Sequence, residues 1–214
     1  MFWLNKASYQ KFNYQIMPEI LIATKNANKT KELNELLSNS NFILKDLNEI
    51  PNISEVIETG KTFAENAVLK AASYALQIKM WALADDSGLE VEALNGAPGV
   101  FSARYAGEFA TDEERINKLL QELNGIVDGR QARFVCAMAV SDEKGEIKFL
   151  AEGICNGKIA VKPSGTNGFG YDPIFIPDGF EQTFGELSVE IKQKISHRAR
   201  AIEKIIRFLG VFAA

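Results

Sequence analysis

Residues 83–94 read LADDSGLEVEAL, where an apolar run meets two adjacent aspartates and a Ser-Gly pair. Residues 81–84 are typical of a buried strand that ends at Asp85 and Asp86. Successive side chains of an extended chain point to opposite faces, so the two carboxylates need not share one site. A carboxylate at the C-terminal end of a strand, where α/β sheets bind ligands, suits Mg²⁺ beside phosphates. A solvated Asp-Asp turn explains the motif equally well.

The segments around this stretch alternate between strand and helix patterns. Strands are predicted at 18–23, 42–47, 81–84, 132–140 and 147–155. Helices are predicted at 29–37, 62–77, 111–123, 188–194 and 196–209. The last helix is expected to turn Ile202, Ile205, Ile206 and Leu209 inward. Gly88, Gly96, Pro98 and Gly99 indicate a loop-rich excursion after the aspartates. Two strands that flank SDEKGE predict a hairpin, so the class is α/β with a mixed sheet.

Composition bounds the class of protein. The chain has 214 residues, 46% of them hydrophobic, which is ample for one domain that we place at 18–214. Its formal net charge of -4 argues against a partner such as a nucleic acid polymer. No apolar run reaches the length of a membrane span, and the two cysteines lack metal-ligand spacing, so a reduced cytoplasmic protein is expected. Residues 1–17 contain no continuous apolar stretch of a signal peptide and are interpreted as an N-terminal extension.

Three further segments carry groups that bind anions or flat ligands. The polar loop at 23–29, ATKNANK, lies between a strand and a helix and has the N–H groups and lysines of a phosphate site, although an ordinary polar loop is the more frequent explanation. The loop at 164–173, SGTNGFGYDP, combines glycines with two aromatic rings. The segment at 192–198, KQKISHR, is a basic cluster that includes the one histidine of the chain. Together with the aspartates they favour a nucleoside triphosphate as ligand.

At this point the chain resembles the inosine/xanthosine triphosphate pyrophosphatase family, which hydrolyses deaminated purine nucleotides. The resemblance rests on ATKNANKTKEL, ETGKTFAENAVLKA, ADDSGLEVEALNGAPGVFSARYAG, GTNGFGYDPIF and KISHRARA, which follow in the family's order from residue 20 to about residue 209. It implies an elongated two-lobed α/β fold around a long mixed sheet, with the active-site cleft between the lobes. It also implies a homodimer.

The resemblance assigns roles to individual residues. Asp86 matches the proton acceptor and metal ligand, and Glu58 is a second candidate ligand for Mg²⁺. Substrate-binding roles fall on Thr24, Lys25, Asn26, Ala27, Asn28, Lys29, Ser87, Phe169, Gly170, Tyr171, Asp172, Lys192, His197 and Arg198. Two positions depart from the family. Lys25 stands where a small residue is common, and Ile57 stands where many relatives carry another acid.

The expected reaction is hydrolysis of ITP, dITP or XTP to the monophosphate and pyrophosphate, with Asp86 activating water in the presence of Mg²⁺. Two other functions stay open. A phosphatase with an aspartate nucleophile would release inorganic phosphate through an aspartyl-phosphate. A nucleotide sensor would bind without turnover. The products formed from nucleotides distinguish the pyrophosphatase, the phosphatase and the sensor.

Overall fold

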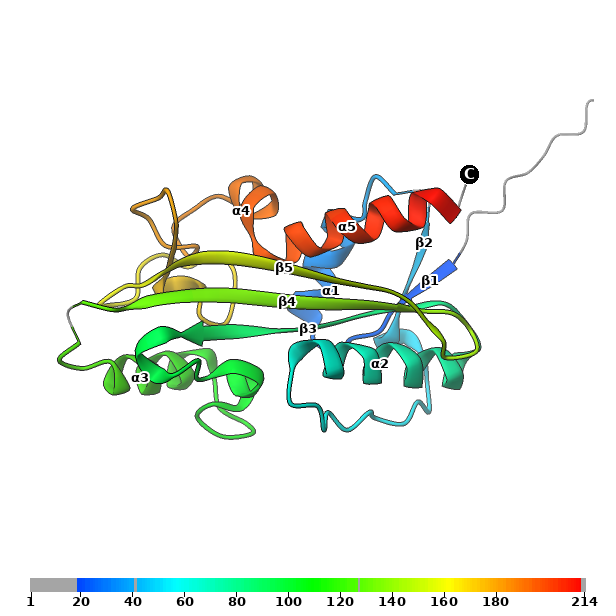
Figure 1. Ribbon diagram of the computed structural model, residues 1–214, viewed down its shortest axis with the longest axis horizontal. Coiled ribbons are helices and arrows are strands. Elements are labelled where there is room, and N and C mark those ends of the chain that lie inside the picture. Colours follow the sequence, from blue (N-terminus) through cyan, green and yellow to red (C-terminus); the bar gives the residue numbers. More distant parts are fainter. Residues whose placement is uncertain (1–18, 41, 127, 213–214) are drawn as a thin grey trace, which may run out of the picture.

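The computed structural model describes residues 19–40, 42–126 and 128–212, which form a six-stranded sheet with helices on both faces (Figure 1). The strands are β1 Glu19–Ile22, β2 Ile43–Asp46, β3 Ala82–Val91, β4 Gln131–Ser141, β5 Ile147–Ile159 and β6 Phe175–Pro177. The helices are α1 Ala27–Leu36, α2 Phe63–Ile78, α3 Asp112–Glu122, α4 Val189–Ile195 and α5 His197–Phe212. The sheet order is β2-β1-β3-β4-β5-β6. β1 pairs in parallel with β2 and β3, and the other neighbours are antiparallel, which confirms the predicted mixed sheet.

The short strand β1 shows how the sheet is buried on both faces. Ile20 and Ile22 pack in the core under α1 and α5, whereas Leu21 and Ala23 pack in the core under α2. Figure 1 shows α5 on one side of the long strands β3–β5 and α2 on the other. A strand covered on both faces must be apolar at every position, which is why this run does not alternate.

The strand predicted to end at the aspartates continues six positions beyond Asp85. β3 runs to Val91 because β4 pairs with it along its whole length, from Ala82 opposite Ser141 to Val91 opposite Ala132. The prediction of a loop at Gly88 is therefore wrong. A Cβ atom there would lie 2.4 Å from Ser102 Oγ and 2.6 Å from the Gly99 carbonyl, so this glycine permits close packing inside a strand rather than a turn.

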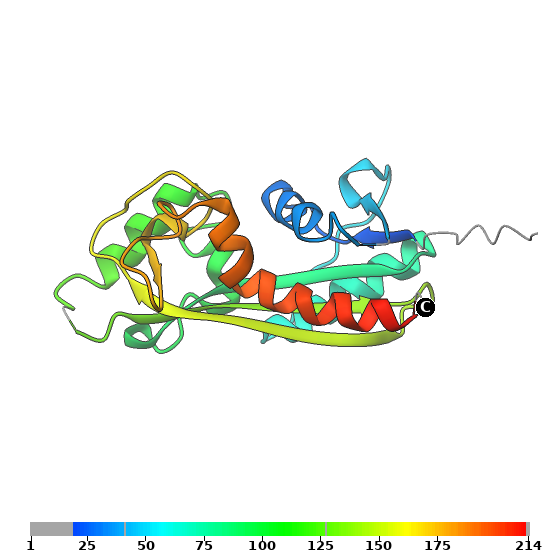
Figure 2. The ribbon, with the colours of Figure 1, turned by 90° about the horizontal axis from the view of Figure 1, so that it is seen from above.

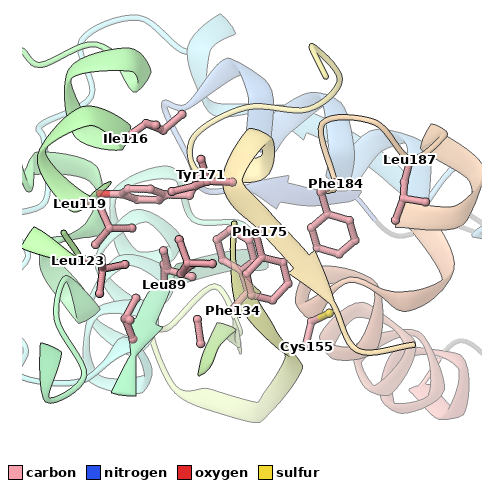
Figure 3. Packing of buried hydrophobic residues seen from close by; sticks show 14 residues of the cluster. Leu89, Ile116, Leu119, Leu123, Phe134, Cys155, Tyr171, Phe175, Phe184 and Leu187 are labelled. Carbon is pink, nitrogen blue, oxygen red and sulfur yellow. The ribbon is translucent and has the colours of Figure 1, made fainter. Parts of the chain in front are cut away.

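A separate hydrophobic core fills the end of the sheet beyond the aspartates. Figure 3 shows Leu89 of β3, Leu119 of α3 and the rings of Phe134, Phe175 and Phe184 in contact there. The rings of Phe134 and Phe175 lie 4.5 Å apart between centroids. The molecule thus has cores at both ends of its long strands, which agrees with the elongated shape in Figure 1.

The starts of α2 and α3 and the hairpin agree with the sequence more closely than the buried face of α5 does. Capping boxes begin α2 at Thr62 and α3 at Thr111, as predicted. The hairpin of β4 and β5 is also confirmed. In α5 the prediction is wrong for Ile206, which is 38% exposed because it lies at the margin of the face that packs on the sheet. α1 begins at Ala27, inside the predicted polar loop, because Asn26 caps it.

Two predictions concern the ends of the chain and its setting. Residues 1–17, interpreted as an extension, lie outside the described residues. Among the residues that the structure describes, none of the helices has the length and apolar character needed to cross a membrane.

Candidate functional site

Asp85 and Asp86 are consecutive residues of β3, and their side chains leave the sheet on opposite faces, as the pleat predicts. Asp85 Oδ2 lies 3.1 Å from Lys29 Nζ and 3.2 Å from Arg198 Nη2. Asp86 faces α2, where Asn66 Nδ2 donates to its Oδ2 at 3.0 Å. The neighbouring carboxylates therefore have separate partners.

The two carboxylates also differ in charge balance. Burial by itself raises the pKa of Asp85, but Lys29 and Arg198 outweigh it and hold that pKa well below its ordinary value. Burial raises the pKa of Asp86 above its ordinary value, and the Lys70 ammonium, 3.5 Å from Oδ1, opposes this shift only in part. Asp85 is a fixed anion at neutral pH, whereas Asp86 is the better proton acceptor of the two.

Lys70 links the two carboxylates that the sequence offers as metal ligands. Its Nζ donates to Glu58 Oε1 at 2.8 Å as well as facing Asp86. Burial lowers the pKa of Lys70, but Asp86, Asp85 and Glu58 outweigh it and raise that pKa above its ordinary value, so the ammonium stays charged.

The donor set of Glu58 and Asp86 fits Mg²⁺. This ion prefers carboxylate oxygens and is often held by one or two of them, with water and phosphate oxygens completing the shell. Within the described ranges of the chain, no three or more His, Cys, Asp or Glu side chains gather so that they could hold a metal. A cation here would therefore depend on oxygen atoms from the substrate and from water.

A cavity of about 170 Å³ lies beside Ser87, which shares a face of β3 with Asp85. Of the predicted substrate-binding residues, those that line it are Asn26, Asn28, Lys29, Ser87, Phe169, Gly170, Tyr171, Asp172, Lys192, His197 and Arg198. The lining does not include the described residues Thr24, Lys25, Ala27, Glu58 and Asp86. Helices α1 and α4, far apart in sequence, lie side by side in Figure 2 and are joined by the contact of Lys192 with Glu32.

Two cations of the basic cluster predicted at 192–198, Lys192 and Arg198, are paired with carboxylates and are not free positive groups. Lys192 Nζ donates to Asp172 Oδ2 at 2.5 Å and to Glu32 Oε1 at 2.7 Å. Arg198, only 1% exposed, donates to Glu32 as well as to Asp85. A buried guanidinium requires such partners because unpaired burial of its charge is very costly. An anionic ligand must therefore compete with carboxylates for these cations.

His197 is buried against the aromatic core of the outer end of the sheet. Its ring stacks on Phe134 with 4.7 Å between centroids. Burial, together with Arg198 and Lys192, lowers the pKa of His197 well below its ordinary value. The imidazole is neutral at neutral pH, and its Nδ1 has no hydrogen-bond partner among the described residues. It can offer a ligand a hydrogen bond but no charge.

The loop that carries Phe169 is fixed by backbone hydrogen bonds to two aspartates. Phe169 N donates to Asp172 Oδ2 at 2.8 Å, and Gly170 N donates to Asp112 Oδ2 at 2.6 Å. Gly168 has a φ of +74°, and a Cβ atom there would meet Asp172 Oδ2 at 1.9 Å, so only glycine fits. The two hydrogen bonds and the conformation of Gly168 together hold the Phe169 ring at the cavity.

The predicted phosphate loop caps its own helix. Asn26 Oδ1 accepts hydrogen bonds from Asn28 N at 3.0 Å and Lys29 N at 3.2 Å, which leaves fewer free N–H groups for a phosphate. Lys25 points to the surface, where its Nζ lies 3.8 Å from Glu55. Its φ is not in the left-handed region, so the lysine does not strain the turn.

Sequence reasoning missed four polar residues that organise the site: Glu32, Asn66, Lys70 and Asp112. Asn66 and Lys70 stand one helical turn apart on the face of α2 that packs against the sheet. A polar pair four residues apart among apolar inner positions was the signal that could have identified them, because buried polar groups need partners. Glu32 and Asp112 gave no such signal, since carboxylates are ordinary on helix surfaces.

The comparisons with known proteins agree with this fold and its residues. The family model described as the Ham1 family matches residues 20–208. A dITP/XTP pyrophosphatase of Bacillus cereus is 49% identical over 191 residues, which are 88% of this chain and 93% of that protein. The solved structure of a HAM1 protein from Coxiella burnetii has a TM-score of 0.82 and 43% identity, and the match covers 91% of this chain and 99% of the other.

The structure of the Staphylococcus aureus Ham1 protein is similar to the same degree, with a TM-score of 0.80 and 43% identity over 90% of this chain and 98% of the other. The chain belongs to the Ham1 family.

Proposed function

We propose that the protein hydrolyses the deaminated purine nucleoside triphosphates ITP, dITP and XTP to the monophosphate and pyrophosphate. The name of the Bacillus cereus relative, dITP/XTP pyrophosphatase, supports the substrate class. The observation that carries the proposal is the pair of environments on β3. One face has a cavity with an aromatic ring and paired cations, and the other has Asp86 with a raised pKa beside Glu58 and Lys70.

In this mechanism Asp86 accepts a proton from the attacking water. The oxygen of that water bonds to the α-phosphorus, and the bond to the bridging oxygen of the β-phosphate breaks, so that pyrophosphate leaves. Asn66 holds Asp86 Oδ2 and thereby orients the carboxylate. Glu58 and Asp86 would hold Mg²⁺, which when bound offsets phosphate charge. Lys29 lines the cavity and supplies positive charge toward the phosphates.

Selection of a 6-oxo purine requires hydrogen-bond donors at its 6 position. The backbone N–H groups of Phe169 and Gly170 are already bonded to aspartates, whereas His197 Nδ1 and Arg198 Nε have no hydrogen-bond partner among the described residues. In our proposal the side chains of His197 and Arg198, which line the cavity, are therefore the donors. The base would stack on the Phe169 ring, where Lys192 Nζ already lies 5.1 Å from the ring centroid.

The test is to identify the products from ITP, XTP, dITP, GTP and ATP with Mg²⁺. We expect pyrophosphate and the monophosphate from the first three, with little turnover of GTP and ATP. Inorganic phosphate together with an acid-stable aspartyl-phosphate would instead establish the phosphatase. Nucleotide binding without any product would establish the sensor.

The assembly and compartment follow from the same proposal. We expect a homodimer in the cytoplasm, as the family resemblance implies. Light scattering should give twice the mass of one chain. A mass equal to one chain at micromolar concentration would contradict the dimer.

A further inference from the structure

Lys70 is a charged side chain within the apolar face of a helix. α2 presents Phe63, Ala67, Ala71 and Tyr74 to the sheet, and Lys70 lies on the same face with only 8% of its surface exposed. Packing alone would favour an apolar residue here, because burying an ammonium is costly unless it is paired. The buried ammonium of Lys70 must therefore be stabilised by charged partners.

The partners of Lys70 are the two carboxylates proposed as metal ligands. Its Nζ lies 2.8 Å from Glu58 Oε1 and 3.5 Å from Asp86 Oδ1. The other oxygen of Asp86 is held by Asn66, a neutral donor. Asp85, the next nearest carboxylate along the strand, is paired with Lys29 and an arginine. A single ammonium therefore faces the two carboxylates of Glu58 and Asp86, so this group has one more negative charge than positive charges.

We propose that Lys70 couples cation binding to polyphosphate binding. In the protein without nucleotide, its ammonium occupies the carboxylate oxygens of Glu58 and Asp86 and so weakens their affinity for a divalent cation. A polyphosphate offers the ammonium another anionic partner and releases both carboxylates. This inference rests on the proposed function for the identity of the polyphosphate.

The local structure allows this exchange. The side chain of Glu58 is 30% exposed, so the cluster is open to solvent on that side. An ammonium on a flexible four-carbon stem carries three rotatable donors, and lysine is a common phosphate ligand. Asp86 stays oriented by Asn66 when the ammonium moves, because that hydrogen bond is independent of Lys70.

The first test measures cation binding without nucleotide. Mg²⁺ is titrated by calorimetry, and Mn²⁺ by electron paramagnetic resonance, into the full-length protein and into Lys70→Met. We expect the variant to bind both cations at least about 10-fold more tightly, since an ammonium within 4 Å shifts carboxylate equilibria by that order. A variant that merely disturbed the site would bind more weakly. Equal or weaker binding by a folded Lys70→Met overturns the proposal.

The second test adds inorganic pyrophosphate as the probe. In the wild type, pyrophosphate should tighten Mn²⁺ binding, and in Lys70→Met most of that gain should disappear. No gain in the wild type, or an equal gain in the variant, contradicts the coupling. If Lys70→Met does not fold, Lys70→Gln serves the same purpose, because it also removes the charge.

A matched control and a separate readout complete the design. Lys61→Met removes an exposed lysine just before α2 and should leave both titrations unchanged. Tighter cation binding by Lys70→Met in a protein that releases no pyrophosphate from nucleotides would reject the proposed function and keep the coupling. If the wild type hydrolyses the nucleotides normally but Lys70→Met binds cations as the wild type does, the proposed function is kept and the coupling is rejected.

Discussion

Asp85 and Asp86 are neighbours with the same side chain in the same strand, yet they face opposite surroundings. Asp85 is fully buried, and its Oδ2 faces two cations that belong to a larger ion network with Glu32 and Lys192. Asp86 is nearly buried but shares a single ammonium with Glu58. On one face of the sheet the carboxylate is paired with two cations, and on the other face two carboxylates share one cation.

This difference assigns stability and chemistry to different faces of one strand. A carboxylate whose pKa is held low by fixed cations is a poor base but joins helices to the sheet. A carboxylate whose burial is only partly compensated is ready to take a proton or a cation. The following predictions test that division, beginning with the largest effect.

Asp86→Asn should abolish most of the activity without unfolding the protein. Asparagine keeps the shape of the side chain but cannot accept the proton, so kcat for ITP should fall at least about 100-fold while nucleotide binding stays measurable. The melting temperature should be unchanged or higher, because a buried carboxylate with a raised pKa is destabilising when ionised. Near-normal turnover would refute the assignment of the chemistry to Asp86.

The pH dependence of wild-type turnover sharpens the same comparison. kcat/KM, which reports the ionisation of the free protein, should decline as the pH falls through the pKa of Asp86, which lies above the ordinary value of 3.8. Asp85 should add no limb to this profile, since its pKa lies below that value. A profile flat down to pH 4 would contradict the role of Asp86.

Asp85→Asn should reduce the stability of the fold more than it reduces turnover, the opposite of what we expect for Asp86→Asn. Removing one partner of a buried ion pair leaves Lys29 and Arg198 undercompensated, and we expect a loss of about 3 kcal/mol in the free energy of unfolding in urea. Turnover of the folded fraction should fall less than in Asp86→Asn. Glu203→Gln, which breaks an exposed pair on α5, is the control and should leave stability unchanged. A loss of turnover as large as that of Asp86→Asn would mean that both aspartates act in chemistry.

His197→Gln should change how stability responds to pH. The folded-state pKa of His197 is lowered, so the unfolded chain takes up the proton first as the pH falls below about 6.5. The wild type should therefore lose stability relative to His197→Gln between pH 6.5 and 5, by up to about 1.4 kcal/mol per pH unit. The measurement is the difference between the two unfolding free energies at each pH. A constant difference would show that the imidazole is not buried in its neutral form.

The smallest effect is expected from the N-terminal extension. Deleting residues 1–16 should leave kcat and the melting temperature unchanged, because the family resemblance and the apolar pattern both begin after it. A truncated protein that is folded but inactive would show that the extension contributes to the site.

Much of the architecture could be predicted from local patterns. The apolar run at β1, the capping boxes of α2 and α3 and the hairpin of β4 and β5 each depend on residues close together in sequence. The length of β3 could not be predicted in this way. Its continuation through Ser87 and Gly88 is decided by pairing with β4, some 50 positions later in the chain.

The candidate site divides in a similar way. The alternation of Asp85 and Asp86, and the segments that line the cavity, were predicted from the sequence. The charge balance of the site could not be predicted. Glu32 of α1 pairs with Lys192, which lies 160 positions later, and this partner of the basic segment cannot be recognised from the sequence around that segment. Lys70 was missed for a different reason, since the polar pair that it forms with Asn66 on the buried face of α2 is a signal present in the sequence.

The sequence alone therefore determined the family, the mixed α/β sheet and the two directions of the adjacent aspartates, since motifs, periodicity and the pleat are properties of the local chain. Only the tertiary structure decided which aspartate is paired with two cations and which shares one lysine with Glu58. Charge balance depends on distances between elements far apart in sequence, and folding sets those distances.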